Sequence, residues 1–150
     1  METAAYVDAV VSHAMSTGYF SRVNKHEPKT APPDGLTAAV WFNSIDPLRN
    51  NPSLIATSVR LVVTVRIYVG MIQEPQDGID DQVMECVDKL MEAYSGDFTL
   101  DGLIREVDLL GQHGTPLSCQ AGYLTIDHKM MRVVDINVPL IINDAWSQVP

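Results

Sequence analysis

Residues 58–69, SVRLVVTVRIYV, alternate between two kinds of side chain, and this pattern constrains the fold more than any other feature of the chain. Every second residue is apolar, and the set is Val59, Leu61, Val63, Val65, Ile67 and Val69. The positions between them are mostly polar and include Arg60 and Arg66. Because successive side chains of a β-strand point to opposite faces, the pattern predicts a strand with one buried face. Such a strand is ~40 Å long, so we expect it to bend or to project beyond its sheet.

Two other segments have the apolar spacing of amphipathic helices. Residues 4–17 carry an apolar stripe formed by Val7, Val10, Val11 and Ala14. Residues 80–94 show the same spacing after an acidic cluster, Asp77, Asp80 and Asp81. We interpret these aspartates as helix capping, because carboxylates complement the start of a helix. The alternating ligands of a calcium loop are absent from this cluster.

Four further segments are strand candidates: residues 36–45, the region 98–111 around Asp101–Gly102, residues 119–126 and residues 129–142. The last two are joined by Asp127–His128, which predicts a hairpin. Consecutive strands with short links and two helices predict an α+β fold: a small antiparallel or mixed β-sheet with the two main helices packed on one side. We expect residues 1–150 to form a single domain with a polar C-terminal tail at about 143–150.

The composition of the chain limits which binding partners and which cellular location we expect. The chain has 150 residues, a net charge of −9 and a pI of about 4.6. Such a surface repels nucleic acid, so we do not expect direct DNA binding, although DNA could still pass through an assembly of this protein. The N-terminal segment lacks the basic start of a signal peptide, and no apolar run approaches the ~20 residues of a membrane span. We therefore expect a soluble protein made in a cytoplasm.

The sequence offers few candidates for chemistry. Cys86 and Cys119 do not have the spacing of a zinc site or a redox pair, so we expect two buried, reduced thiols. The four histidines, His13, His26, His113 and His128, have no histidine partner at helical metal-ligand spacing. Ser118 lacks the flanking glycines of a nucleophile elbow. We predict no catalytic, cofactor-binding or metal-binding residue, and a small enzyme with a pocket of His113, Cys119 and Asp127 stays as an alternative.

Arg60 and Arg66 are the notable cations of this acidic chain. On one strand they share a face and stand ~20 Å apart. They can pair with acids on a neighbouring strand, such as Glu106, Asp108 or Asp135, or they can pair across a subunit boundary. Trp146 poses the same question, because it can dock the C-terminal tail on its own chain or contact a partner.

Three runs of the sequence resemble the tail terminator proteins of long-tailed, siphovirus-type bacteriophages. The first is VRIYVGMIQEPQDGIDDQVMECVDKLMEAYSGDFTLDGLIREVDLLG, at 65–111. The others are GTPLSCQAGYLTIDHKMMRVVDINVPLIINDAW, at 114–146, and GLTAAVWFNSIDPL, at 35–48. The likeness covers nearly the whole chain, and it is a likeness of sequence style and element order rather than of a short catalytic motif.

The resemblance implies a structural virion protein with a mixed α/β sandwich fold. Such proteins form a homohexameric ring at the head-proximal end of the tail, where they stop polymerisation of the tail tube protein. The ring also joins the tail to the head–tail connector, and genomic DNA passes through its lumen. It implies no catalytic activity and no cofactor. On this interpretation the subunit interface would include Arg60, Arg66, Tyr68, Gln73, Glu74 and Trp146. The alternatives are another neck or connector component and, from a different class, a small α+β ligand-binding domain or enzyme.

Overall fold

The structure is a computed structural model that describes residues 1–18, 20, 22–25, 36–48, 56–70, 78–126 and 128–147. Its elements follow one another as two helices and six strands. In chain order they are α1 (Thr3–Ser16), β1 (Arg22–Asn24), β2 (Thr37–Pro47), β3 (Ala56–Gly70), α2 (Gly78–Gly96), β4 (Glu106–Val107), β5 (Ser118–Ile126) and β6 (Lys129–Ser147). No helix among these residues is long and apolar enough to cross a bilayer.

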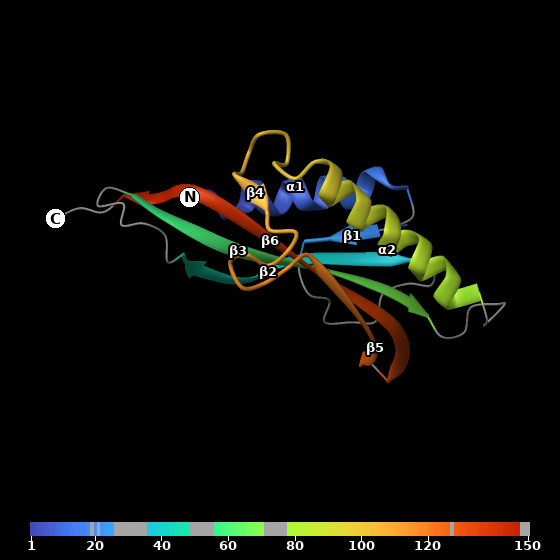
Figure 1. The fold of residues 1–150 in the computed structure, drawn as a ribbon. Helices are drawn as coiled ribbons and strands as arrows, with labels where there is room; N and C mark the ends of the chain where they lie inside the picture. Colours follow the sequence, from blue (N-terminus) through green and yellow to red (C-terminus); the bar gives the residue numbers. More distant parts are fainter. Residues whose placement is uncertain are drawn as a thin grey trace.

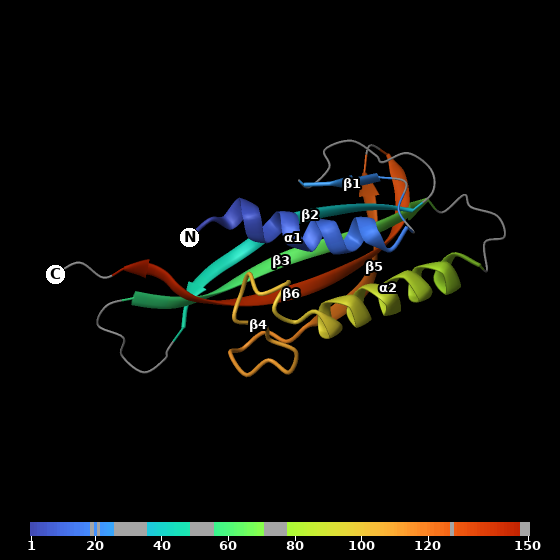
Figure 2. The same ribbon diagram turned by 90° about the horizontal axis from the view of Figure 1, so that it is seen from above.

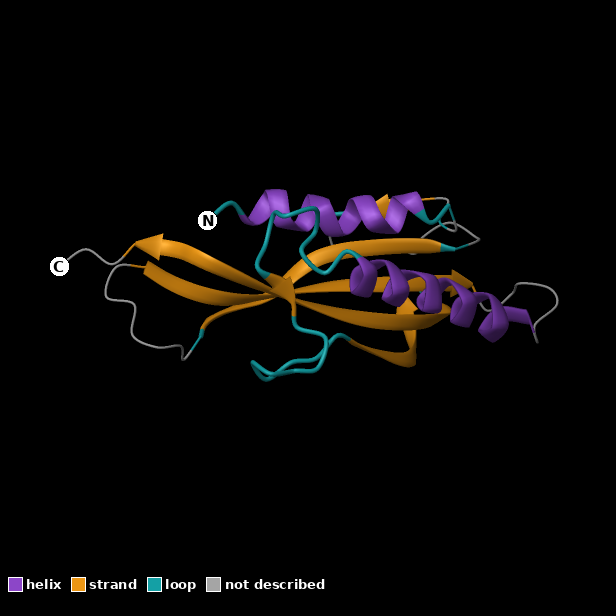
Figure 3. Cartoon of the chain, turned by 45° about the horizontal axis from the view of Figure 1, so that its top comes forward, coloured by secondary structure: helices purple, strands orange, loops and turns teal. Residues whose placement is uncertain are grey.

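All six strands belong to one twisted sheet with the order β1-β2-β3-β6-β4 (Figure 1). β5 also pairs with β6, so β4 and β5 share the edge of β6 that faces away from β3. The β1–β2 pair is parallel and the other pairs are antiparallel, which makes the sheet mixed. Both helices cover the same side of the sheet (Figure 3). α1 lies over the β2 side and α2 over the β6 side (Figure 2). The α+β fold predicted from the sequence is confirmed.

β3 and β6 form the longest ladder of the sheet. Their register runs from Ala56 opposite Ser147 to Gly70 opposite Met131. β2 ends at Pro47, opposite Val59, so the first residues of β3 pair with β6 beyond the end of β2. β3 therefore extends beyond β2 but stays paired with β6 from Ala56 to Gly70, so it does not project beyond its sheet as one of the two expectations had it.

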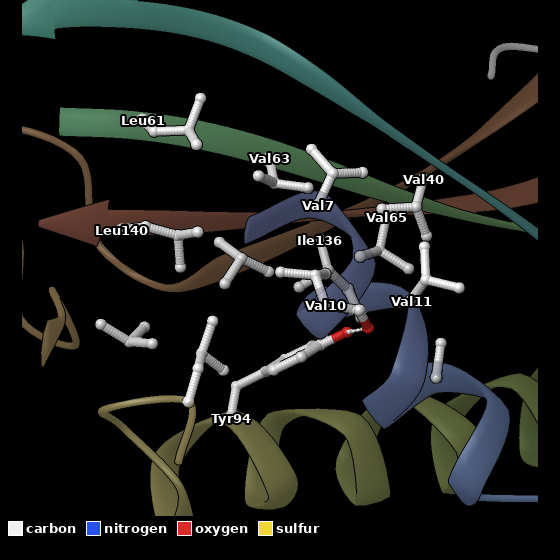
Figure 4. Close-up of a cluster of buried hydrophobic side chains, with 14 of the residues drawn as sticks. Val7, Val10, Val11, Val40, Leu61, Val63, Val65, Tyr94, Ile136 and Leu140 are labelled. Carbon is white, nitrogen blue, oxygen red and sulfur yellow. Dashed lines mark hydrogen bonds between the residues drawn. The ribbon is translucent and has the colours of Figure 1, made fainter. Parts of the chain in front are cut away.

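The core lies between the helices and the side of the sheet that they cover. The alternating apolar residues of β3 from Val59 to Ile67 enter it together with Val40 of β2, Ile136 and Leu140 of β6, and the apolar stripe of α1 (Figure 4). Tyr94 of α2 points into the same cluster, and its hydroxyl donates to the carbonyl oxygen of Val10 at 3.1 Å. Burial raises the pKa of Tyr94 far above its ordinary value, so the phenol stays neutral.

Three expectations from the sequence need correction. The expected tail does not begin at 143, because β6 continues through Ser147 and Trp146 pairs with Thr57 of β3, while residues 148–150 lie outside the described residues. Cys86 is buried as expected, but Cys119 is exposed. The sequence pattern also missed β1, since three residues are too few to show a periodicity.

Candidate functional site

The side of the sheet without helices carries polar residues at its centre. Because cross-strand partners lie on the same side of a sheet, Arg66 of β3 faces there with Asp135 of β6. Thr64 faces there with Asn137 of β6. Arg60 faces there too, opposite Asp46 of β2. This polar face was anticipated from β3 alone, and the structure adds the partner that each polar group finds on a neighbouring strand.

Arg66 is held most firmly. Its Nε donates to Asp135 Oδ1 at 2.6 Å, and its Nη2 donates to Asp135 Oδ2 at 3.0 Å, which makes a two-pronged ion pair. The guanidinium also lies 5.2 Å from the centre of the Trp41 ring. The hydrogen bond to Asp135 raises the pKa of Arg66 above its ordinary value, against a smaller opposing effect of burial. The arginine is therefore charged at any pH at which the protein folds.

Arg60 links three parts of the chain. Its Nη2 donates to Asp46 Oδ2 of β2 at 3.1 Å, and its Nη1 donates to the carbonyl oxygen of His113. His113 lies in the loop at 108–117, between β4 and β5. Gly114 has a φ of +112°, and a Cβ at this position would stand 2.6 Å from the Arg60 guanidinium. Glycine at 114 therefore allows both the backbone turn and the close approach of the cation.

The loop at 108–117 is fixed by a buried carboxylate. Asp108 accepts hydrogen bonds from the backbone N–H groups of Gln112 at 2.9 Å and His113 at 2.8 Å. The Asp108 carbonyl accepts a further bond from the N–H of Leu117 at 3.1 Å. These bonds hold the loop in one shape, although its tip carries Leu110, which is 84% exposed. Asp108 is thus not the ion-pair partner of an arginine that the sequence suggested.

A hydroxyl and two amides continue the polar face between the two arginines. Asn43 Nδ2 donates to Thr64 Oγ1 at 3.0 Å, and Thr64 Oγ1 lies 3.4 Å from Asn137 Oδ1. Asn43 sits at an irregularity of β2, where the register with β3 shifts between Phe42 and Ser44. The extra residue of such a bulge has no partner in the regular ladder of backbone hydrogen bonds. The bulge could not be predicted from the sequence, because the alternation of apolar and polar residues along β2 is weak.

Two apolar grooves lie on the helix-bearing side, one at each outer edge of the sheet. The first, of about 620 Å³, lies between α1 and β2 and includes Val7, Trp41 and Phe42, with the Asp8–Lys25 ion pair at 2.5 Å beside it. The second, of about 570 Å³, lies between α2 and the β5–β6 hairpin. Its lining is mainly apolar and consists of Val83, Met84, Val87, Asp88, Met91, Cys119, Ala121, Arg132 and Val134.

The residues expected at a subunit interface are spread over the molecule. Arg60, Arg66 and Tyr68 lie on β3, and Tyr68 is only 1% exposed. Trp146 lies near the end of β6 and is 43% exposed. Gln73 and Glu74 lie outside the described residues. Both arginines pair within the chain, as the first of the two interpretations of their role required, and Asp46 is a partner that the sequence had not suggested.

The pocket expected for an enzyme is not assembled from the residues described. His113 Nε2 lies 3.9 Å from Glu106 Oε1 in the loop region, whereas Cys119 lines the groove beside α2. Asp127 lies outside the described residues. Within the described ranges no group of three histidine, cysteine, aspartate or glutamate side chains is placed to hold a metal ion. Of the acidic cluster around the start of α2, the structure describes the side chain of Asp81, which lies in the first turn of the helix and is exposed.

Comparison with protein-family models and with curated protein sequences finds no match. Among solved structures, the chain is similar to the sheath/tube terminator of an extracellular contractile injection system, PVC, in its extended state. The TM-score is 0.37 and the sequence identity is 14%. The similarity covers 94% of this chain and 59% of the other, so the chain spans less than two thirds of the length of the protein it matches. A similarity this distant does not assign a function to the chain.

Proposed function

We propose that this chain is a structural subunit that assembles head to tail into a ring. The observation that carries this proposal is the exposure of large apolar side chains near both edges of the sheet, the β2 edge and the β4–β5 edge. Phe42, on β2, is 56% exposed, and Met15 of α1 is exposed on the same side. On the β4 and β5 side, the exposed side chains are Met84, Phe98, Leu103, Leu109, Leu110, Tyr123 and Met130. Two different apolar surfaces on one subunit favour a contact between unlike surfaces, and such contacts form a ring when the rotation between neighbouring copies closes.

The ring we propose is a tail terminator at the head-proximal end of a virion tail. This choice among ring-forming proteins rests on the sequence resemblance, which extends over nearly the whole chain. A closed ring has no free edge of its own, so it would stop the growth of a tube on which it sits. One face of the ring would bind the tail tube protein and the other the head–tail connector. The net charge of −9 suits a lumen through which genomic DNA passes without being held.

The structure also limits how the arginines can act in such a ring. Arg66 forms a bidentate ion pair with Asp135, so Arg66→Glu would place two carboxylates against each other on this side of the sheet. That variant is expected to destabilise the subunit itself, and a loss of assembly would then say little about the interface. Trp146, which is exposed and far from this ion pair along β3 and β6, is the better residue for testing a predicted contact.

The test is a native mass spectrum of the purified chain over a wide range of concentration. A closed species at six times the mass of the 16.5 kDa subunit is the expected result. If the chain stays monomeric, it is mixed with the tail tube protein of the same virion, and the tube length is measured by electron microscopy. Capped tubes of defined length support the terminator, whereas a monomer that neither binds nor shortens tubes contradicts the proposal.

Another neck or connector component is the closest competing proposal, because it would expose the same apolar surfaces. The two differ in their partner. A terminator binds the end of the tail tube, whereas a connector component binds the connector ring and leaves tube growth unchanged. The same mixing experiment with each partner therefore separates them.

A small ligand-binding domain is the alternative from another class, and the groove between α2 and β5 is the observation in its favour. Its apolar lining and volume are typical of small-molecule sites. In that case the groove would be occupied in a chain that is monomeric at all concentrations. A ligand retained through purification and seen in the native mass spectrum of a monomer would support it over the ring.

A further inference from the structure

β5 is an outer strand that lacks the usual protections of an edge. It pairs with β6 from Ser118 to Ile126 without a register shift, and no strand in the described part of the chain pairs with its other edge. Its sequence, SCQAGYLTI, contains no charged residue and no proline. Exposed edges of soluble proteins are normally short, bulged or interrupted by charges and prolines, because an open edge recruits further strands. The edge of β5 is therefore available for strand addition.

The groove between α2 and β5 would receive side chains of an added strand. Cys119 and Ala121 are small residues on the side of β5 that faces the helices, since their partners Ile136 and Val134 belong to the core side of β6. They leave the groove open toward the free edge of β5, and Met84 of α2 is exposed beside it. A strand laid along β5 would form backbone hydrogen bonds, and its alternate side chains would reach over these small residues.

The opposite edge of the same sheet offers a strand that fits this position. β1 pairs with β2 only at Thr37–Ala39, so the outer edge of residues 40–47 has no strand partner among the residues described. Phe42 lies in this stretch opposite Val63, a core residue, so its ring is on the helix-bearing side. It is 56% exposed there. The chain thus carries an open strand with a projecting aromatic ring on one edge and an open strand beside an apolar groove on the other.

The strand directions make these two edges compatible. β2, β3, β6 and β5 are each antiparallel to the next, so β5 runs opposite to β2. Two copies placed side by side in the same orientation therefore bring β5 of one antiparallel to β2 of the other, with all helices on one side. Through their partners on β3, residues 40–47 stand level with β6 residues that lie mostly beyond the end of β5. For β5 to pair with residues 40–47 of a second copy, the two copies must therefore be offset along the strand direction. A stagger between neighbouring strands is also required when a sheet closes into a barrel.

We propose that the outer edge of β5 pairs with residues 40–47 of β2 in a second copy, and that Phe42 of that copy enters the groove between α2 and β5. This inference rests on the proposed ring and names the contact that closes it. The contact uses unlike surfaces, so each copy keeps one open β5 and one open β2 until the ring is complete.

The native thiols provide the test. Cys119 is exposed at the proposed contact, whereas Cys86 is buried, and desolvation raises the pKa of its thiol to about 12. A bulky maleimide should therefore modify Cys119 selectively in the folded chain. We expect the modified chain to be unable to form the ring, and the assembled ring to react at least tenfold more slowly than the free subunit. The matched control is Cys119→Ser combined with Ser95→Cys, which moves the label to the exposed end of α2 and should leave assembly unchanged.

A cross-link between copies tests whether residues 40–47 of a second copy lie beside β5. Phe42→Cys, with the native Cys119, should give covalent oligomers with a short bifunctional maleimide. Ala4→Cys, on the rim of the α1 groove, serves if Phe42 itself is needed for assembly. A control with Ser16→Cys, on the exposed end of α1, should give none.

The outcomes separate this inference from the proposed function. A ring that forms equally well after Cys119 is modified, and that gives no cross-link, overturns the β5–β2 contact and leaves the ring standing. A chain that forms no ring, alone or on tail tubes, overturns both. Protection of Cys119 that appears only when tube protein is added, without cross-links between copies, assigns the edge to the tube protein and also overturns the inference.

Discussion

The two sides of β3 are stabilised by different interactions. On the helix-bearing side, Val63 and its apolar neighbours are buried in a continuous core that includes both helices. On the other side, Arg60, Thr64 and Arg66 each find a specific polar partner on a neighbouring strand or loop. Burial of apolar surface is non-directional and tolerates many neighbours, whereas an ion pair or hydrogen bond needs one partner at one distance. The first side therefore supplies most of the stability, and the second selects one register.

The magnitudes support this division. Complete burial of a valine, leucine or isoleucine side chain contributes about 1.5–3 kcal/mol. A hydrogen bond that replaces one to water contributes about 0.5–1.5 kcal/mol net, and exposed ion pairs contribute less. Six buried apolar side chains on one side of β3 therefore outweigh the polar contacts on the other, where Tyr68 belongs to a smaller apolar cluster with Ala39, Met131 and Val133. The comparison can be tested on adjacent residues.

Val63 and Val62 are the matched pair, because they are the same residue type on opposite sides of one strand. Val63 is fully buried in the core, and Val62 is 5% exposed on the side without helices, between Ser44 and Pro139. We expect Val63→Ala to lower the free energy of unfolding by about 2–3 kcal/mol and Val62→Ala by about 1 kcal/mol. Urea unfolding of both variants measures this, and equal losses would contradict the division between the two sides.

Asp135→Ala tests the strongest contact of the polar side. It removes the carboxylate that pairs with the Arg66 guanidinium and leaves the guanidinium beside Trp41 and Tyr68. We expect a loss of about 1–2 kcal/mol in the free energy of unfolding, because both partners are partly exposed and water can reach the cation. Arg66→Met in the same background should recover part of this loss, since it removes the unpaired charge.

The double-mutant cycle sharpens this prediction. Arg66→Met alone, Asp135→Ala alone and the double variant are compared by urea unfolding at one salt concentration. A coupling energy near zero would mean that the two-pronged geometry adds nothing to stability, and the polar side would then select the register without stabilising it.

The sequence predicted the helix-bearing side well and the polar side only in part. The alternation along β3 identified the residues of that strand that are buried on the helix-bearing side, because period two depends on the side chains of one segment alone. The partner of Arg66 was among three candidate acids, since a sequence does not fix which residues stand opposite one another. Asp46, the partner of Arg60, was missed because the strand candidate ends at residue 45, whereas β2 continues to Pro47.

Two other errors have the same origin. Asn143 and Asp144 are polar, so the end of β6 was interpreted as a tail, but the first residues of β3 provide backbone partners that extend the ladder. Cys119 was expected to be buried as a typical free thiol. It is exposed because the helix-facing side of β5 lies beside the groove at α2 rather than under a helix. In both cases the structure of the segment depended on an element distant in the sequence, and the local sequence pattern does not show which element packs against it.

Alkaline pH should weaken the helix-bearing side selectively. Cys86 of α2 is part of the core, and desolvation raises the pKa of its thiol from 9.0 to about 12. Between these values the unfolded chain has lost this proton while the folded chain keeps it, so the free energy of unfolding falls as the pH rises. This group alone accounts for a loss of about 1.4 kcal/mol by pH 10, and Tyr94 adds to it in the same direction above its ordinary value.

Urea unfolding at pH 8 and pH 10 checks this, with Cys86→Ala as the comparison. The variant is less stable at pH 8 because it loses apolar contacts, but it should lose less stability between the two pH values than the parent chain. Lysines and the other tyrosines are expected to titrate alike in both proteins, so the difference between the two slopes reports Cys86 together with its electrostatic effect on Tyr94. Parallel slopes would mean that the thiol is accessible to water in the folded state.

Thr64→Val is expected to have the smallest effect and tests whether the polar side acts through single contacts. Thr64 is buried, accepts a hydrogen bond from Asn43 and lies 3.4 Å from Asn137 Oδ1, at the long end for a hydrogen bond. Valine keeps the shape, and both amides are partly exposed and can bind water instead, so we expect a loss of about 0.5–1 kcal/mol. Urea unfolding beside Asp135→Ala makes the comparison. If Thr64→Val is the more damaging of the two, the hydroxyl and its amides, rather than the Arg66 ion pair, hold the register between β2, β3 and β6.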